Sequence, residues 1–364
     1  MTPDTAKKYQ KIKLYILLLG LFIDVLFWII LITSGWASSL AVAASRFSSH
    51  FLVQFYFFVL GLGALNLFIH LPLSFYSGYI VEHRFALSHQ TIWRWAIEQL
   101  KGLLLGVILG GITLTIFYLI LWRYPHSWWL LVWVFLLFFS VVLGRLAPLL
   151  IFPLFYKFTP LENEDLKQRI ENLAENWKIK ISGVFQFNLS KNTRKANAAL
   201  TGLGKTRRVI LGDTLLTLCS PSEIETVFAH EIGHHVQRHM LKGILFSSLI
   251  SLIGLWVTFQ IYQAILVQQG YTAYQLEALP CLGLIFFAYS LFTTPLTNYI
   301  SRHFEYQADR FAVQLTHRDD FISALQKLAE SNLADKTPHP LVEFLFYSHP
   351  SINHRLEKIK GIKI

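Results

Sequence analysis

The sequence LYILLLGLFIDVLFWIILITS occupies residues 14–34 and decides the fold class, because it is apolar throughout except for Asp24. A helix needs about 20 apolar residues to cross a bilayer. A backbone inside a bilayer must satisfy its own polar groups, so we predict a transmembrane helix here. No small-residue cleavage site follows, so we expect a retained anchor rather than a removed signal peptide. A charge at this depth is costly, and Asp24 is expected to face a cavity or to lie near the membrane surface.

Five further stretches share this length and this scarcity of charge. They are residues 51–75, 102–122, 127–152, 243–267 and 278–301. The chain is therefore predicted to be mainly α-helical, with a transmembrane bundle of six helices. The composition agrees, since 54% of the residues are hydrophobic and 15% are charged, whereas a soluble domain carries about 25% charged residues. This balance excludes a disordered chain and an ordinary soluble enzyme.

Basic residues are unevenly distributed among the connections between these stretches. They gather before the first stretch and between the second and third: Lys7, Lys8, Lys11 and Lys13, then Arg84, Arg94 and Lys101. Connections rich in Lys and Arg remain in the cytoplasm. We therefore predict that the N-terminus and residues 76–101, 153–242 and 302–364 are cytoplasmic. This orientation signal accounts for the net charge of +10, so we predict a lipid bilayer as a partner and no nucleic acid.

The same pattern divides the chain into four regions. Residues 1–152 contain the first four membrane helices, and residues 153–242 form a cytoplasmic region whose motif, described below, makes it the predicted catalytic region. Residues 243–301 contain two further membrane helices, and residues 302–364 form a second cytoplasmic region. Within residues 161–177, helical spacing places four side chains on one stripe: Leu166, Ile170, Leu173 and Trp177.

Three short segments of the catalytic region have strand patterns. They are residues 182–189, 196–201 and 207–212, with a turn at residues 202–205. Ser220, Pro221 and Glu223 then have the order of a capping box with proline at the first helical position, so a helix is predicted to begin there. We expect a small α+β region attached to the membrane bundle.

This last helix carries the sequence HEIGH at residues 230–234. Residues four positions apart share one face of a helix, so His230 and His234 can reach a single zinc ion. Glu231 lies beside them, where its carboxylate can take a proton from water. The alternative is a polar helix face with chance histidines. Cys219 and Cys281 are too few for a four-thiolate site or a disulfide framework.

A catalytic zinc site needs a third protein ligand and one open position. His239 lies nine residues after His230, whereas an extended metzincin motif requires a histidine at the tenth position and a glycine at the seventh. Glu305 is the better candidate, and Asp309 lies one helical turn beyond it, where it can orient a ligating histidine. The alternative for this pair is a solvated acidic face balanced by Arg302 and Arg310. We expect His235, His239, His303 and His354 to be surface or interface histidines.

The order of features along the chain resembles that of the type 1 CAAX prenyl proteases, a family of integral-membrane zinc proteases. In this order, membrane spans are followed by HExxH, then by two more spans, and then by Glu-x-x-x-Asp. Short segments elsewhere are similar too, and all are taken from this sequence: Ser77-Gly78-Tyr79, His83-Arg84-Phe85, Leu87-Ser88, Gln90, Phe158-Thr159-Pro160-Leu161-Glu162, Asn197-Ala198 and His349-Pro350-Ser351 with Arg355. The similarity extends from about residue 50 to the end of the chain. It implies a zincin-like catalytic region associated with the membrane.

The resemblance also implies roles for individual residues. One zinc ion per chain would be bound by His230, His234 and Glu305, with Glu231 as general base and Asp309 supporting a ligand. The substrate, a peptide or protein that carries a prenyl group in the eukaryotic members, would lie along an edge strand. The residues of that strand are Ala196, Asn197 and Ala198. His349 and Arg355 resemble the pair that steadies the oxyanion and the substrate, and their alternative is a tail histidine and a surface arginine.

Longer members of the family have seven spans, and six are predicted here, as in a shorter, bacterial member. A bacterial inner membrane and the endoplasmic reticulum both remain open as locations, since no retention signal ends the chain. A quality-control protease that degrades misfolded membrane proteins would share the chemistry but not the substrate. A membrane scaffold or transporter would share only the spans.

Overall fold

The structure is a computed structural model that describes residues 3–202 and 207–362. Most of the turn predicted at residues 202–205 therefore lies outside the described residues. Within the described part, the six predicted membrane helices are confirmed, since six helices are long and apolar enough to cross a bilayer. They are α1 (Pro3–Thr33), α3 (Phe51–Phe75), α5 (Ile92–Arg123), α6 (Trp128–Leu146), α11 (His239–Gln269) and α12 (Leu279–Leu315).

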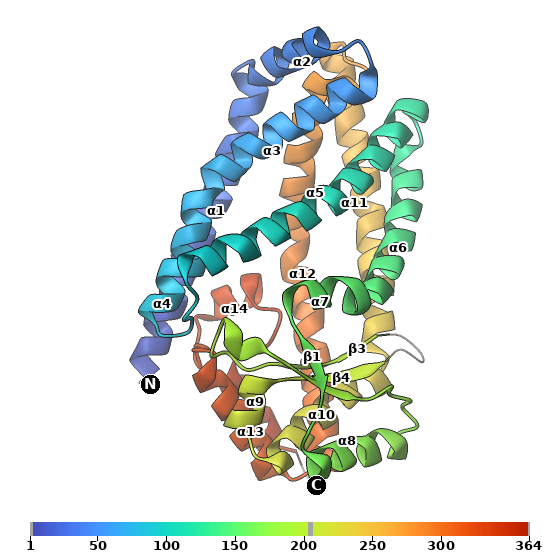
Figure 1. Cartoon of the computed structure of the whole chain (residues 1–364). Coiled ribbons are helices and arrows are strands. Elements are labelled where there is room, and N and C mark those ends of the chain that lie inside the picture. The colour runs from blue at the N-terminus through green and yellow to red at the C-terminus, as the bar shows by residue number, and fades with distance from the viewer. Residues whose placement is uncertain (1–2, 203–206, 363–364) are drawn as a thin grey trace.

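The long helices form an elongated bundle, and the sheet and short helices gather at one end of it (Figure 1). Both chain termini lie at this end, whereas helix α2 (Trp36–Phe47) closes the opposite end. Two membrane helices continue as π-helical turns at the end that holds the sheet, which we call the catalytic end because it contains the predicted catalytic region. These turns are η1 (Tyr76–Val81) after α3 and η2 (Ala147–Ile151) after α6. The short helices α4 (Glu82–Arg84) and α7 (Phe152–Phe155) follow these turns.

Helix α12 is continuous from the bundle into the catalytic end (Figure 1). It therefore runs unbroken through residue 301, where we place the predicted boundary between membrane and cytoplasm. The remaining helices at this end are α8 (Glu164–Asn176), α9 (Asp213–Leu218), α10 (Pro221–Val236), α13 (Arg318–Ser331), α14 (Pro340–Phe346) and α15 (Ile352–Lys360), with the short 3₁₀ turn η3 (Leu189–Lys191). A second 3₁₀ turn, η5 (Leu276–Ala278), directly precedes α12 at the opposite end, beside α2.

Four strands form one sheet in the order β1-β2-β4-β3. Their bounds are β1 (Phe158–Pro160), β2 (Val184–Phe187), β3 (Ala198–Thr201) and β4 (Arg208–Gly212). Strands β2 and β4 are parallel, and β1 and β3 pair antiparallel at the two edges. The three predicted strands are present, and β1 is an additional one. Strand β3 is an edge strand, so one of its sides is open to another chain.

One hydrophobic core joins the sheet to the helices of the catalytic end. Leu166, Ile170 and Leu173 of α8 are buried in it, together with Leu211 of β4 and Phe228 of α10. The predicted stripe is wrong at its last residue, because α8 ends at Asn176 and Trp177 is 37% exposed. Lys178 has a positive φ of 54°, which breaks the helical spacing directly after Trp177.

A cavity of about 620 Å³ lies between the membrane helices. Its lining is apolar except for a few side chains, and it includes Phe27 and Trp28 of α1 and Asn66 of α3. One helical turn away on the same two helices, Asp24 Oδ1 lies 3.0 Å from His70 Nε2. The charge expected to be costly inside the bilayer therefore has a partner on the neighbouring helix.

Candidate metal centre

Helix α10 begins with the predicted capping box. Ser220 Oγ accepts a hydrogen bond from the Glu223 backbone, and Glu223 Oε2 accepts one from the Ser220 backbone at 2.7 Å. Burial alone raises the pKa of Glu223, but hydrogen bonds from Lys327, Ser323 and the Ser220 backbone outweigh it and lower the pKa to about 2. The cap fixes the first turn of the helix that carries His230 and His234.

Gly233 allows α10 and α12 to approach closely. A Cβ atom at this position would lie 3.1 Å from Ala308 Cα and 3.2 Å from its carbonyl oxygen. Any larger residue would therefore push the two helices apart. Ala308 directly precedes Asp309 on α12 and lies about one helical turn after Glu305. This contact therefore brings both carboxylates against the histidines of α10.

Two imidazole nitrogens and the two oxygens of one carboxylate converge at this helix contact. His230 Nε2 lies 3.1 Å from His234 Nε2, and Glu305 Oε2 lies 3.4 Å from His230 Nε2. Glu305 Oε1 lies 3.3 Å from His234 Nε2. The three residues form the group in the described part of the chain whose donor atoms could hold a metal ion.

The donor set fits a tetrahedral zinc site. Two imidazole nitrogens and one carboxylate oxygen are ligands that zinc prefers, and three protein ligands leave the fourth position open for water or substrate. Ligand bonds of about 2.0–2.2 Å in a tetrahedron separate the ligand atoms by roughly 3.4 Å. The two imidazole nitrogens are 3.1 Å apart, and each lies 3.3 or 3.4 Å from one of the two Glu305 oxygens, which is close to this value.

Asp309 and Arg355 support the first histidine from behind. Asp309 Oδ1 lies 2.9 Å from His230 Nδ1, and the Arg355 guanidinium donates to both Asp309 oxygens, at 2.8 and 2.5 Å. Glu305 is 5% and Asp309 2% exposed, which excludes the solvated acidic face. Burial lowers the pKa of His230, but hydrogen bonds to Asp309 and Glu305 outweigh burial and raise this pKa to about 9.

His239 was expected at a surface or interface, and the structure assigns it a specific contact. It is buried, and its Nδ1 lies 3.0 Å from His234 Nδ1. Its Nε2 lies 2.9 Å from Gln307 Oε1. His239 therefore contacts the side of His234 that faces away from the other ligands, as Asp309 does for His230. The only sequence signal for this contact is a histidine five residues after His234.

Arg302 and Arg310 do not balance the two acidic residues of α12. Arg302 is buried and its Nη1 donates to the carbonyl oxygens of Glu343 and Tyr347, at 2.9 and 2.6 Å. Arg310 is exposed. The carboxylate of Glu343 accepts the Ser351 backbone N–H at 3.0 Å. These bonds hold the segment that carries His349.

A cavity of about 580 Å³ opens over the three ligand residues. It brings together all of the predicted site residues except Asp309, which lies behind His230; the lining includes Glu231, His349, Arg355, Ala196, Asn197 and Ala198. His349 is 64% exposed at its side chain, and its Nε2 lies 3.4 Å from Glu305 Oε1. Arg355 is buried, and its Nη1 lies 3.7 Å from Glu305 Oε2, so it is not a surface arginine.

The open edge of the sheet borders this cavity. The Gly212 backbone N–H donates to the Asn197 carbonyl at 2.9 Å, so the backbone of Asn197 faces β4. Backbone groups alternate in direction along an antiparallel pair, and those of Ala198 therefore face the open edge. Asn332, which was not predicted from the sequence, also lines the cavity.

Comparison with known proteins shows which families the chain matches. Residues 160–363 match the model of peptidase family M48. Residues 2–157 match a second model, described as the CAAX prenyl protease N-terminal region with five membrane helices.

Three similar proteins represent a bacterium, a plant and a yeast. The uncharacterized metalloprotease YhfN of Bacillus subtilis is 31% identical over 97% of this chain and 84% of its own length. A CAAX prenyl protease 1 homolog of Arabidopsis thaliana is 34% identical over 84% of this chain and 73% of its own length. The crystal structure of S. mikatae Ste24p matches with a TM-score of 0.89 and 27% identity, over 99% of this chain and 90% of that one.

A membrane bundle whose HExxH helix meets a carboxylate from a neighbouring helix defines a membrane metalloprotease. The chain belongs to peptidase family M48 and, within it, to the CAAX prenyl protease family. It is an integral-membrane metalloendopeptidase whose substrates are peptides or proteins.

Proposed function

We propose that this protein hydrolyses peptide bonds at the membrane surface with one zinc ion, bound by His230, His234 and Glu305. The observation that carries the proposal is the convergence of two imidazole nitrogens, 3.1 Å apart, on the Glu305 carboxylate, whose Oε2 lies 3.4 Å from His230 Nε2 and whose Oε1 lies 3.3 Å from His234 Nε2. When bound, zinc polarises the carbonyl group of the scissile bond and lowers the pKa of water at the site.

Glu231 is the general base of the proposed reaction. It follows a ligand residue directly and lines the cavity over the ligands. Its carboxylate takes a proton from the attacking water and transfers this proton to the nitrogen of the leaving amine. The oxygen of the water forms the new carboxylate as the C–N bond breaks.

His349 and Arg355 both line the cavity beside the Glu305 carboxylate. The exposed His349 side chain reaches into the cavity, where its ring N–H donates to the oxygen that gains charge during attack. Arg355 is held by both oxygens of Asp309 and lies 3.7 Å from Glu305 Oε2, so its positive charge contributes beside the ligands. Asp309 keeps the proton of His230 on Nδ1, which leaves Nε2 free to bind the ion.

The substrate backbone extends along the edge formed by Ala196, Asn197 and Ala198. These residues line the cavity at the start of edge strand β3. A peptide that adds to a sheet edge is held by its main chain, so the same strand can present many sequences to the base.

Prenylated C-terminal peptides are the proposed substrate class. The support comes from the relatives named CAAX prenyl protease 1 and from the similarity over both membrane and catalytic parts. The four regions with boundaries at residues 152, 242 and 301 remain part of this proposal. So does the cytoplasmic orientation, which rests on the lysines at the N-terminus and on the N-terminus lying at the catalytic end (Figure 1).

A cleavage assay on purified protein tests the proposed function. A farnesylated peptide, its unprenylated form and unfolded casein are each incubated with and without a chelator. Preferred, chelator-sensitive cleavage of the farnesylated peptide supports the proposal. Preferred cleavage of casein assigns the quality-control role instead, and no cleavage with no bound metal rejects the enzyme.

A further inference from the structure

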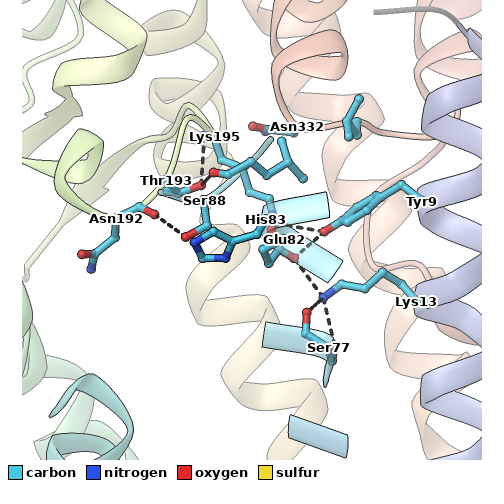
Figure 2. A network of polar contacts seen from close by, with 12 residues as sticks. Tyr9, Lys13, Ser77, Glu82, His83, Ser88, Asn192, Thr193, Lys195 and Asn332 are labelled. Atoms are coloured by element: carbon cyan, nitrogen blue, oxygen red, sulfur yellow. Dashed lines mark hydrogen bonds and ion pairs between the residues drawn. The ribbon is translucent and has the colours of Figure 1, made fainter. Parts of the chain in front are cut away.

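The chain is tightly held just before it reaches the substrate edge. We call residues 192–196 the approach segment, since they lead into strand β3. The segment lies between the catalytic end of α1, the α4 region and the end of α13, and polar contacts reach it from all three (Figure 2). None of these contacts belongs to the ligand set of the metal centre.

The membrane side of the approach segment pairs with the residues that follow α4. Ser88 and Thr193 form an isolated antiparallel bridge. Ser88 Oγ donates to the Asn192 carbonyl at 3.0 Å, and Thr193 Oγ1 donates to the Leu87 carbonyl at 2.9 Å. The Arg194 backbone N–H also donates to Leu87, at 2.9 Å. The segment is therefore attached to the end of a membrane helix.

Glu82 is the centre of the next set of contacts. Glu82 as a whole is 9% exposed. Its carboxylate contacts three groups, as Figure 2 shows. Glu82 Oε2 lies 3.0 Å from Lys195 Nζ. Glu82 Oε1 lies 3.0 Å from Lys13 Nζ and accepts the Tyr9 hydroxyl at 2.7 Å. Lys195 Nζ also donates to the Tyr9 hydroxyl, at 3.1 Å.

The opposite side of the approach segment is bound by Asn332. Its Oδ1 accepts the Ala196 backbone N–H at 3.0 Å, and its Nδ2 lies 3.3 Å from the Ala196 carbonyl. The Lys195 carbonyl accepts the Thr214 hydroxyl at 2.8 Å. Lys195 and Ala196 are thus fixed from two sides, one residue before Asn197 enters the sheet.

These contacts have a consequence for the substrate edge. A buried carboxylate that faces two ammonium groups stays in place, because losing one partner leaves an unpaired buried charge. Small displacements of a group that positions substrate cost up to about 100-fold in rate. A side chain that fixes Lys195 therefore acts on the three residues that follow it.

We propose that Glu82 is a positioning residue for peptide hydrolysis, which holds the substrate edge in register through Lys195. This inference rests on the proposed role of Ala196, Asn197 and Ala198 as the substrate strand. Glu82 lies on the membrane side of the molecule, so the geometry links the membrane helices α1 and α3 to the site of peptide binding. Asn332 supports the same edge from the side of the cavity.

Two variants test this role. Glu82→Gln removes the charge and keeps the size, and Lys195→Met removes its partner while Glu82 keeps Lys13 and Tyr9. We expect each to lower kcat/KM by about 10–100-fold, mainly through a raised KM, with full metal content. The double variant is expected to lose little more than either single variant, because both act through one contact. Glu164→Gln, in an exposed pair with Lys167, is the matched control.

Hydrogen exchange gives a readout that does not depend on activity. Faster deuterium uptake at residues 198–201 in both variants, with an unchanged control and an unchanged HExxH helix, supports the role of Glu82. Unchanged uptake at residues 198–201 together with an unchanged KM in both variants overturns it. If the unmodified protein cleaves none of the peptides, the proposed function fails, while the exchange measurement still decides whether Glu82 holds the strand.

Discussion

The rings of His234 and His239 meet through their Nδ1 atoms, which lie 3.0 Å apart. Only one of these two atoms can carry the hydrogen. A metal-binding His234 uses Nε2, so its Nδ1 carries the hydrogen and His239 Nδ1 accepts it. His239 then has its own hydrogen on Nε2, which faces Gln307 Oε1 at 2.9 Å. This series of hydrogen bonds fixes the orientation of the His234 ring, which is a predicted metal ligand.

His239→Ala should therefore lower metal affinity by about 10–100-fold, the usual cost of removing a partner that orients a ligand. Competition with a fluorescent chelator measures the change. His303→Ala, an exposed histidine on α12, serves as control and should bind metal as the unmodified protein does. An unchanged affinity in His239→Ala would show that His234 needs no such partner.

Glu231→Gln should lower peptide cleavage by about 100–10,000-fold, because the amide cannot take a proton from water. The metal content should stay at one ion per chain, since all three ligands remain. Elemental analysis and turnover are measured on the same sample. Normal turnover in this variant contradicts the role of Glu231 as base.

Glu305→Ala should lose metal and activity together, because two imidazoles alone hold the ion weakly. Glu330→Ala, an exposed glutamate paired with Lys336, should lose neither. Elemental analysis after dialysis separates the two variants. A fully metallated, active Glu305→Ala protein would remove this residue from the ligand set.

Asp309→Ala should lower the free energy of unfolding by about 3–5 kcal/mol, because it leaves the buried Arg355 without its main partner. Arg355→Met in the same chain should restore part of the loss, since the unpaired charge is then gone. Thermal unfolding in detergent, without added metal, compares the variants. Equal unfolding temperatures for Asp309→Ala and the unmodified protein contradict the expectation.

Glu223 should make the fold sensitive to acid. Its pKa of about 2 in the folded state lies below the unfolded value of about 4.3. The ionised carboxylate, 2.7 Å from Lys327 Nζ, therefore stabilises the fold above about pH 4.3 and loses this effect as the pH falls toward 2. Glu223→Gln should weaken this acid dependence in thermal unfolding, whereas Glu330→Gln at an exposed pair should leave it unchanged.

The sequence predicted the membrane helices because length and hydropathy decide whether a segment crosses a bilayer. It also predicted the start of α10 at Ser220, because a capping box is a local pattern. Glu305 could be predicted as a ligand because it lies just after a predicted span and one helical turn before Asp309. Strand β1 was missed, since a three-residue strand that ends in Pro160 has no alternating pattern.

The partners of the ligands could not be predicted in the same way. The chain turns between α10 and α11 so that His239 faces His234, because Arg238 has a positive φ of 56°. This conformation is uncommon for arginine and cannot be predicted from the residue type. Lys195 and Glu82 are far apart in the chain and meet only through the fold. Spacing along one helix is visible in a sequence, and contacts between elements are not.

Helix α12 belongs both to the membrane bundle and to the candidate metal centre. The same unbroken helix, Leu279–Leu315, crosses the bilayer and delivers Glu305. The two histidines precede α11, and Glu305 follows most of α12, so a continuous piece of the chain that includes all three candidate ligands also includes the hydrophobic parts of both helices. Proteolytic release from the membrane would inactivate this peptidase rather than liberate it.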